Sequence, residues 1–521
     1  MPEPIKEGRR YLPGLDGLRA VAVLGVLAYH LGLSAVPGGL LGVSVFFTLS
    51  GYLITDLLLS QVGAGELSLR SFWLARARRL LPALFMLLAV VGAWVTVFGP
   101  HQTTAFRDGA ASAALYVNNW WAILRDVSYF AQFDAPGPLN HLWSLSVEEQ
   151  FYLVWPLLLV AGVRLVREPR QSVGRPRLGL AVLAMAAASA VTMAAVYEPG
   201  TDPSRVYYGT DTRAAELLVG AALATVWPSR RLQATVADRA RGVIDGVGVA
   251  GLLVIAVLFA RTEAFSSFLY RGGFVLLSIA TAAVVASVAH PASRLGPLLG
   301  SRPLRWIGAR SYGLYLWHVP IIVLTTPEGT AYPSAPRAVA QLTATFVVAG
   351  LSWRFVEDPI RHGALGRLWA EWREGAWRGQ RFLTPARGAA MTAAVLVVVP
   401  ALAGFAGAGL EDAGTPDAEI TISKTVTDGT TTTGGPTTTD PGDGEALGPC
   451  TSVVHVGDST SLGLVSTAYL PDEADQSPAQ YARVGVTTQH YEIAGGRAII
   501  ESYKDNPAAR DSAQRWRDEG Y

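Results

Sequence analysis

The chain contains eleven apolar runs, most of them close to the roughly 20 residues that a helix needs to cross the hydrocarbon core of a bilayer. Half of the 521 residues are hydrophobic and only 16% are charged, whereas soluble domains carry about 25% charged residues. These proportions argue against an ordinary cytosolic enzyme. They predict an all-α polytopic membrane protein with about ten core transmembrane helices and an eleventh linking helix. The runs lie near residues 17–33, 40–60, 80–98, 143–163, 178–196, 212–227, 243–260, 272–289, 311–326, 338–356 and 389–409.

Basic residues are distributed unevenly between the segments that connect these runs. If the N-terminus is cytoplasmic, the segments on its side carry 26 Lys and Arg and the opposite side carries 7, with Arg213 at the start of a span counted among the seven. Because Lys and Arg accumulate on the cytoplasmic side, we expect a cytoplasmic N-terminus and an extracytoplasmic tail. No small-residue cleavage site follows the first run, which therefore predicts a permanent helix rather than a cleavable signal.

A twelfth apolar stretch, residues 110–124, carries Asn118 and Asn119. Amides without partners are costly in lipid. The sequence therefore predicts a re-entrant or interfacial segment here rather than a span.

The composition excludes several other classes of protein. The 14 Trp, 18 Tyr and 17 Phe, together with the long apolar runs, exclude collagen-like and disordered chains. Cys450 is the single cysteine, so an intrachain disulfide framework and a cysteine-rich metal site are excluded. The formal net charge of +1 gives no indication of a nucleic-acid partner.

The composition changes after the last apolar run. Residues 411–449 are rich in Thr, Gly, Pro and Asp, which predicts a flexible linker. After it, Ser452 to Val456 predicts a buried strand, and Ser459 follows on a tight turn before a helix. Such a turn can expose a nucleophilic serine to backbone N–H groups, although Gly-Asp-Ser is also common turn chemistry.

Ionisable residues within spans are expensive and are candidates for function. Arg19 and His30 lie eleven residues apart in the first span, so they share one helix face about 16 Å apart along the axis. A snorkelling Arg19 and a structural His30 are the simpler alternatives. Glu148 and Glu149 are adjacent and project about 100° apart, so at least one faces a polar cavity or a cation such as Arg19 or His30.

Four further residues extend the candidate set. Arg76 and Arg79, in WLARARRLLPAL, are suited to cytoplasmic anchoring or to binding an anionic cytosolic ligand through its phosphates. Arg213 lies three residues before Glu216, at a spacing that allows an ion pair. His318 lies in the aromatic-rich segment SYGLYLWHVP.

Seven motifs follow one another over residues 9–362: GLDGLRAVAVLGVLAYH, GVSVFFTLSGYLIT, RARRLLPA, HLWSLSVEEQFYLVWP, DTRAAELLVG, SYGLYLWHVP and FVEDPIR. In this order they closely resemble the membrane-bound acyltransferase family 3. The predicted domains are an acyltransferase-like transmembrane domain (1–388), an additional transmembrane helix (389–410), the linker (411–449) and an outer domain (450–521). The arrangement is similar to that of bacterial O-acetyltransferases that modify surface polysaccharides.

The resemblance implies an enzyme of the bacterial plasma membrane without a bound cofactor. Its donor would be cytoplasmic acyl-CoA, acetyl-CoA above all, and its acceptor a hydroxyl of a cell-envelope glycan or glycolipid. The family's essential Arg-x10-His pair corresponds to Arg19 and His30, with the histidine as base or acyl relay and the arginine as a ligand for phosphate or carboxylate. Glu148, followed by Glu149, is the next candidate, as partner or proton acceptor. Arg76, Arg79, Arg213 and His318 are the further substrate-binding candidates.

The Gly-Asp-Ser turn resembles the first block of an SGNH-type esterase or acetyltransferase domain, with Ser459 as the nucleophile. Such a domain needs a later Asp-x-x-His, but His490 is preceded by Thr487 at that spacing, and the chain ends 62 residues after Ser459. We therefore expect residues 450–521 to be a partial SGNH-like domain that is not a competent esterase by itself, and the partner of Cys450 to lie in the missing part.

Two other classes remain open. A secondary transporter would also place charges within many spans, but the two halves show no internal repeat, and the Gly-Asp-Ser tail has no role in transport. A scaffold whose outer domain only binds glycan is the third possibility, which the family motifs disfavour.

Overall fold

The computed structural model describes residues 11–98, 103–130, 137–166, 168, 174–327, 333–373 and 385–405, and in the tail residues 422–427, 452–457, 477, 479, 481, 488–493 and 509–518. The chain divides into two compact units. The first comprises Met1–Ala131 and Ala135–Leu410, and the second comprises Gln132–Asp134 and Glu411–Tyr521. The two units are described separately below.

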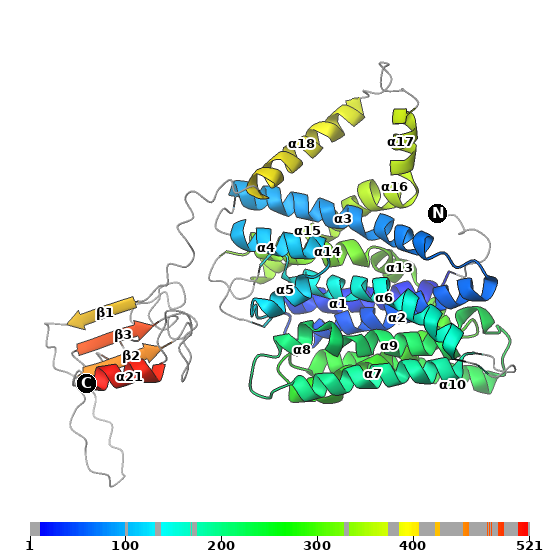
Figure 1. Cartoon of the computed structure of the whole chain (residues 1–521), viewed down its shortest axis with the longest axis horizontal. Coiled ribbons are helices and arrows are strands. Elements are labelled where there is room, and N and C mark those ends of the chain that lie inside the picture. Colours follow the sequence, from blue (N-terminus) through cyan, green and yellow to red (C-terminus); the bar gives the residue numbers. More distant parts are fainter. Residues whose placement is uncertain are drawn as a thin grey trace, which may run out of the picture. The chain divides into compact units, whose positions relative to one another are not determined.

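The first unit is helical, and each of the eleven predicted runs coincides with a helix. Many of these helices, α1, α2, α7, α9 and α10 among them, run nearly parallel to one another (Figure 1). The long helices are α1 (Pro13–His30), α2 (Gly42–Ala64), α3 (Leu69–Phe98), α6 (Trp143–Leu165), α7 (Pro176–Val196), α9 (Thr210–Val226), α10 (Asp238–Arg261), α11 (Phe274–Ala289), α14 (Ser311–Thr325), α15 (Ala335–Ser352) and α18 (Pro385–Phe405). Shorter helices connect them: α4 (Thr103–Ala114), α5 (Asn118–Leu124), α8 (Ser204–Tyr208), α12 (Leu295–Leu299), α13 (Arg302–Ala309), α16 (Asp358–Arg361) and α17 (Ala364–Arg373).

Within the described residues, six helical stretches are long and apolar enough to cross a membrane by length and composition. They are Gly39–Ala64, Leu69–Phe98, Pro176–Val196, Asp238–Arg261, Leu269–Ala289 and Ala335–Arg361. The prediction of a multi-pass helical membrane protein is therefore confirmed. The remaining helices are shorter or more polar, so the count of eleven spans stays a prediction.

Helices α2 and α9 approach each other closely because both carry glycine at their crossing. A Cβ atom built on Gly51 would lie 1.8 Å from the carbonyl oxygen of Leu217, and one built on Gly220 would lie 1.9 Å from that of Thr48. Small residues allow such backbone contact between membrane helices. The crossing fixes the rotation of α2 about its axis, and so the position of the pocket residue Ser50, which is next to Gly51 in the sequence.

The stretch with Asn118 and Asn119 forms two short helices, α4 and α5, rather than one span. Between them Tyr116 adopts a φ of 54°. Asn118 donates to Ser112 (2.9 Å), and Asn119 donates to the Tyr208 carbonyl (3.1 Å) and Thr210 (2.9 Å). Both amides are buried, so these bonds remove the cost that the sequence predicts for them in lipid.

The second unit contains a three-stranded sheet in the order β1-β3-β2. Strand β3 (Thr488–Ile493) pairs antiparallel with β1 (Ile422–Thr427) and parallel with β2 (Ser452–Gly457), and helix α21 (Ala509–Asp518) ends the described part. The predicted strand at residues 452–456 is confirmed, but its side chains at 453–456 are half-buried rather than buried. Strand β1 lies inside the range predicted as linker, so that prediction is wrong for residues 422–427. Four of these six residues (Ile422, Thr425, Val426 and Thr427) are β-branched and favour a strand. Ser459 lies outside the described residues.

Candidate active site

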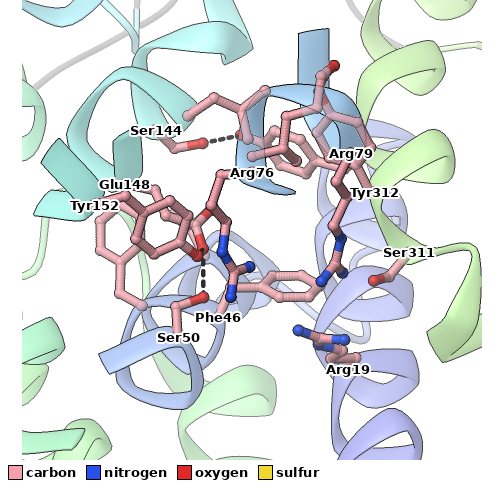
Figure 2. A pocket seen from close by; sticks show the side chains of 15 residues that line it. Arg19, Phe46, Ser50, Arg76, Arg79, Ser144, Glu148, Tyr152, Ser311 and Tyr312 are labelled. Atoms are coloured by element: carbon pink, nitrogen blue, oxygen red, sulfur yellow. Dashed lines mark hydrogen bonds between the residues drawn. The ribbon is translucent and has the colours of Figure 1, made fainter. Parts of the chain in front are cut away.

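Five helices of the first unit, α1, α2, α3, α6 and α14, line a pocket that combines three arginines with hydroxyl and aromatic groups (Figure 2). The pocket encloses about 650 Å³ of space, part of it open to solvent. Its lining residues are Arg19, Val43, Phe46, Phe47, Ser50, Arg76, Arg79, Leu80, Ser144, Leu145, Glu148, Tyr152, Ser311, Tyr312 and Tyr315.

The arginines converge on this pocket from two helices (Figure 2). Arg76 and Arg79 lie three positions apart on α3 and share one face of the helix, whereas the neighbouring Arg78 is exposed. The Arg76 guanidinium lies over the rings of Phe72 (5.5 Å) and Tyr152 (5.2 Å). Among the described residues, neither Arg76 nor Arg79 has a carboxylate within ion-pair distance. Two pocket cations therefore remain available for an anionic ligand.

The third arginine is anchored at the start of α1. Arg19 lies 3.5 Å from the carboxylate of Asp16, which also accepts a hydrogen bond from the Tyr11 hydroxyl at 2.6 Å. Burial and the adjacent Asp16 carboxylate raise the pKa of Tyr11 above its ordinary value, so the phenol remains a donor. Asp16 therefore orients the Arg19 guanidinium and at the same time accepts a hydrogen bond from the neutral Tyr11 phenol.

Glu148 is the only acidic side chain in the pocket lining. It accepts hydrogen bonds from Ser50 of α2 and from Tyr152, one turn further along α6. Both donors are hydroxyls, so no arginine neutralises the carboxylate by direct contact. Glu149 is half-buried and does not line the pocket, but it interacts electrostatically with Glu148, Arg76 and Arg79.

A second group of polar side chains surrounds His30 at the end of α1. Its Nδ1 lies 3.0 Å from the Val26 carbonyl and 3.2 Å from Nε2 of His318, whose own Nδ1 lies 2.6 Å from the Tyr315 carbonyl. Because carbonyls only accept, the pattern is satisfied with one proton on Nδ1 of each ring. Nε2 of His30 is then free to accept from the Tyr129 hydroxyl at 3.0 Å.

The pocket and the histidine group meet at Tyr315. Tyr315 and Ser144 line the pocket, and their hydroxyls are 2.6 Å apart. The Tyr315 hydroxyl also donates to the carbonyl of His141 at 2.8 Å, and the His141 ring lies 5.4 Å from that of His318. A cationic pocket and a cluster of neutral hydrogen-bonding rings are therefore separated by one tyrosine side chain.

Comparison with known proteins identifies the source of this architecture. The sequence model of an acyltransferase domain family matches residues 12–354. The chain belongs to this acyltransferase family. The match includes all five pocket-lining helices, and the resemblance read from the motifs is confirmed.

Individual relatives carry names that agree with the family. The acyltransferase is 46% identical over 363 residues to the peptidoglycan O-acetyltransferase OatA of Listeria monocytogenes, covering 69% of this chain and 57% of the relative. It is 45% identical over 355 residues to a putative peptidoglycan O-acetyltransferase of Bacillus subtilis, covering 68% and 55%. A putative O-acetyltransferase of Staphylococcus aureus is 40% identical over 369 residues, covering 70% and 59%. The chain thus spans just over half the length of these curated relatives, and no solved structure matches it.

The acyltransferase brings together most of the predicted site residues, but in two places. Arg19, Arg76, Arg79 and Glu148 line the pocket. His30 and His318, from helices far apart in sequence, are in direct contact in the adjoining cluster.

Arg213 is separate from both places. It forms the predicted ion pair with Glu216 (2.9 Å), and both side chains are fully buried, at 0% and 1% exposure. Its guanidinium also donates to Ser44 (3.0 Å) and lies over four aromatic rings, the nearest being Phe274 at 4.2 Å. With no part in the pocket lining, Arg213 is placed to hold α9 against α2 and α11, and its role in substrate binding stays a prediction.

Tyr129, like Tyr315, Ser50 and Tyr152, is a site residue that the sequence analysis did not single out. It lies in a connecting segment after α5, where its backbone N–H donates to Ser204 (2.9 Å). Its ring contacts the rings of Trp143 and Tyr208 edge-on and the ring of Tyr207 at an angle of 37°. No pattern in the sequence separates this tyrosine from the other 17.

Proposed function

We propose that the protein is a transmembrane O-acyltransferase. It moves an acyl group, acetyl above all, from cytoplasmic acyl-CoA to hydroxyls of an extracytoplasmic cell-envelope glycan, with peptidoglycan the first candidate because relatives carry that name. The observation that carries the proposal is the direct junction, at Tyr315, between a pocket with unpaired arginines and a histidine with an accepting Nε2.

The pocket provides the donor site in this proposal. Arg19, Arg76 and Arg79 hold the phosphates of acyl-CoA, because guanidinium groups bind phosphate oxygens bidentately and without losing their charge. The excess of basic residues in the segments on the N-terminal side supports a cytoplasmic location for this end, where acyl-CoA is found. Glu148, held by two hydroxyls, repels a phosphate from its end of the pocket.

His30 provides the base. An acceptor hydroxyl takes the place of the Tyr129 phenol and gives its proton to Nε2 of His30, while its oxygen attacks the thioester carbonyl. The C–S bond then breaks, and the thiolate takes up the proton, which yields the ester and free CoA thiol. During this step His318 holds the other side of the His30 ring through Nδ1. In a complete SGNH-type domain, Ser459 is the proposed nucleophile for a second transfer: it takes the acyl group from the ester formed at His30, the first acceptor regains its hydroxyl, and the acyl group passes from Ser459 to the glycan.

The test uses the full chain reconstituted in proteoliposomes with acetyl-CoA and a peptidoglycan oligosaccharide on opposite sides. We expect release of CoA thiol together with acetylated oligosaccharide, read by mass spectrometry, and loss of both with His30→Ala. His362→Ala is the matched control, because His362 is exposed on the turn after α16. Normal transfer by His30→Ala would overturn the assignment of the base. Substrate uptake without thiol release would favour the transporter hypothesis instead.

A further inference from the structure

Tyr315 belongs to both parts of the site, and its position is fixed at three points. Its hydroxyl donates to the carbonyl of His141 and accepts from Ser144, and its backbone carbonyl accepts from His318. Its ring lies 5.5 Å from the ring of His141 and 5.3 Å from that of His318. The side chain is only 6% exposed although it lines the pocket.

His318 connects Tyr315 directly to His30, with 3.2 Å between the facing ring nitrogens. An acyl group that extends from a donor held by the arginines therefore meets the Tyr315 ring before it reaches the base. We propose that Tyr315 limits the length of the acyl group that this enzyme transfers. The proposal rests on the function proposed above and adds a specificity-determining residue to it.

The hydrogen bonds explain why this ring can discriminate between acyl groups. A tyrosine held only by packing can move aside for a longer chain, but this one would have to break the bonds to Ser144 and to the His141 carbonyl, both buried. A rigid wall can discriminate by about 10- to 200-fold per methylene group. We therefore expect acetyl-CoA to be used at least tenfold better than butyryl-CoA.

The experiment compares acetyl-, propionyl- and butyryl-CoA with the full chain in proteoliposomes, measured as thiol release. Tyr315→Ala removes the ring and should raise the butyryl-to-acetyl ratio of kcat/KM at least tenfold. Tyr315→Phe keeps the ring but loses the bonds to Ser144 and to the His141 carbonyl, so its ratio should lie between that of the unsubstituted protein and that of Tyr315→Ala. Tyr312→Ala removes an equal ring from the same pocket and helix, but Tyr312 bonds to the Leu80 carbonyl rather than to the histidines, so its ratio should stay unchanged.

Two results would overturn the proposal: an unchanged ratio in Tyr315→Ala, or an equal rise in Tyr312→Ala. If Tyr315→Ala does not fold, Tyr315→Val provides the same loss of ring with a smaller cavity. For a folded variant without turnover, calorimetry gives the ratio of the dissociation constants of butyryl-CoA and acetyl-CoA, and the same change is expected there. Absence of thiol release from every donor by the unsubstituted protein would instead contradict the proposed function, while the binding ratio would still test Tyr315.

Discussion

Replacing single arginines of α3 should separate donor binding from membrane anchoring. Arg76 and Arg79 face the pocket, whereas Arg78, two residues after Arg76, projects about 200° away around the helix and is exposed. We expect Arg79→Gln to weaken acyl-CoA binding strongly and Arg78→Gln to have little effect. Glutamine keeps much of the side-chain length and removes the charge, so packing changes are kept small.

The magnitude follows from the contacts that the guanidinium makes. A hydrogen bond to a charged group contributes about 1.5–3 kcal/mol, which corresponds to an increase in the dissociation constant of about 10- to 100-fold. Arg79 has no described ion pair that competes for its charge, so its substitution should show the full effect. Arg76→Gln should also destabilise the protein slightly, because this guanidinium lies over Phe72 and Tyr152.

Calorimetric titration of the detergent-solubilised full chain with acetyl-CoA measures this effect. Acetyl-pantetheine, which carries the same thioester without phosphates, serves as the control ligand, and its affinity should be the same in all variants. Equal weakening by Arg78→Gln, or equal loss of acetyl-pantetheine affinity, would refute the assignment of these arginines to the donor phosphates.

Three further outcomes are expected. Tyr129→Phe removes the hydrogen bond that the acceptor hydroxyl has to displace from Nε2 of His30, so turnover should stay within about threefold and the KM for acetyl-CoA should not change. A larger loss of turnover would contradict the displacement of the phenol. Arg213→Ala leaves the buried Glu216 unpaired and should lower the free energy of unfolding by about 3–5 kcal/mol. The double substitution of Arg213→Met with Glu216→Leu removes both charges and should lower it by less. Denaturant unfolding in detergent measures both variants. After reduction, Cys450, the single cysteine, should react with a membrane-impermeant maleimide in intact cells, and labelling only after lysis would reverse the predicted topology.

The helices could be predicted from the sequence because the physical requirement is local. A span needs a continuous apolar run, and that run is visible in the chain whatever surrounds it. The same holds for the i,i+3 pair of Arg213 and Glu216, whose contact depends only on helix geometry. Strand β1 was missed because the composition of its surroundings outweighed a short β-branched stretch.

The site could be predicted only in part, since its contacts join distant segments. His30 and His318 could each be recognised as an imidazole within an apolar run. Their contact joins residues 288 positions apart, so no local spacing predicts it. Tyr129 had no such contrast with its neighbours, and its role follows only from the hydroxyl that reaches His30. Residues that function through charge or imidazole could therefore be found by their cost in lipid, whereas a residue that functions through an ordinary phenol could not.

The arrangement of charge also explains how such a protein could transfer an acyl group without transporting its donor. The charged side chains that line the pocket come from α1, α3 and α6. Beyond Tyr315 lie His30, His318 and Tyr129, whose hydrogen bonds to one another and to the Val26 and Tyr315 carbonyls are satisfied with neutral rings. A nucleotide phosphate moving past Tyr315 would lose its arginine partners, because the buried Arg213 beside the Tyr207 ring is already paired with Glu216. It would incur the large cost of an unpaired buried charge. A thioester carbonyl carries no net charge and incurs no such cost. In the proposed function, the arginines that hold the donor therefore also stop it at Tyr315, and only the acyl group has a physical reason to reach His30.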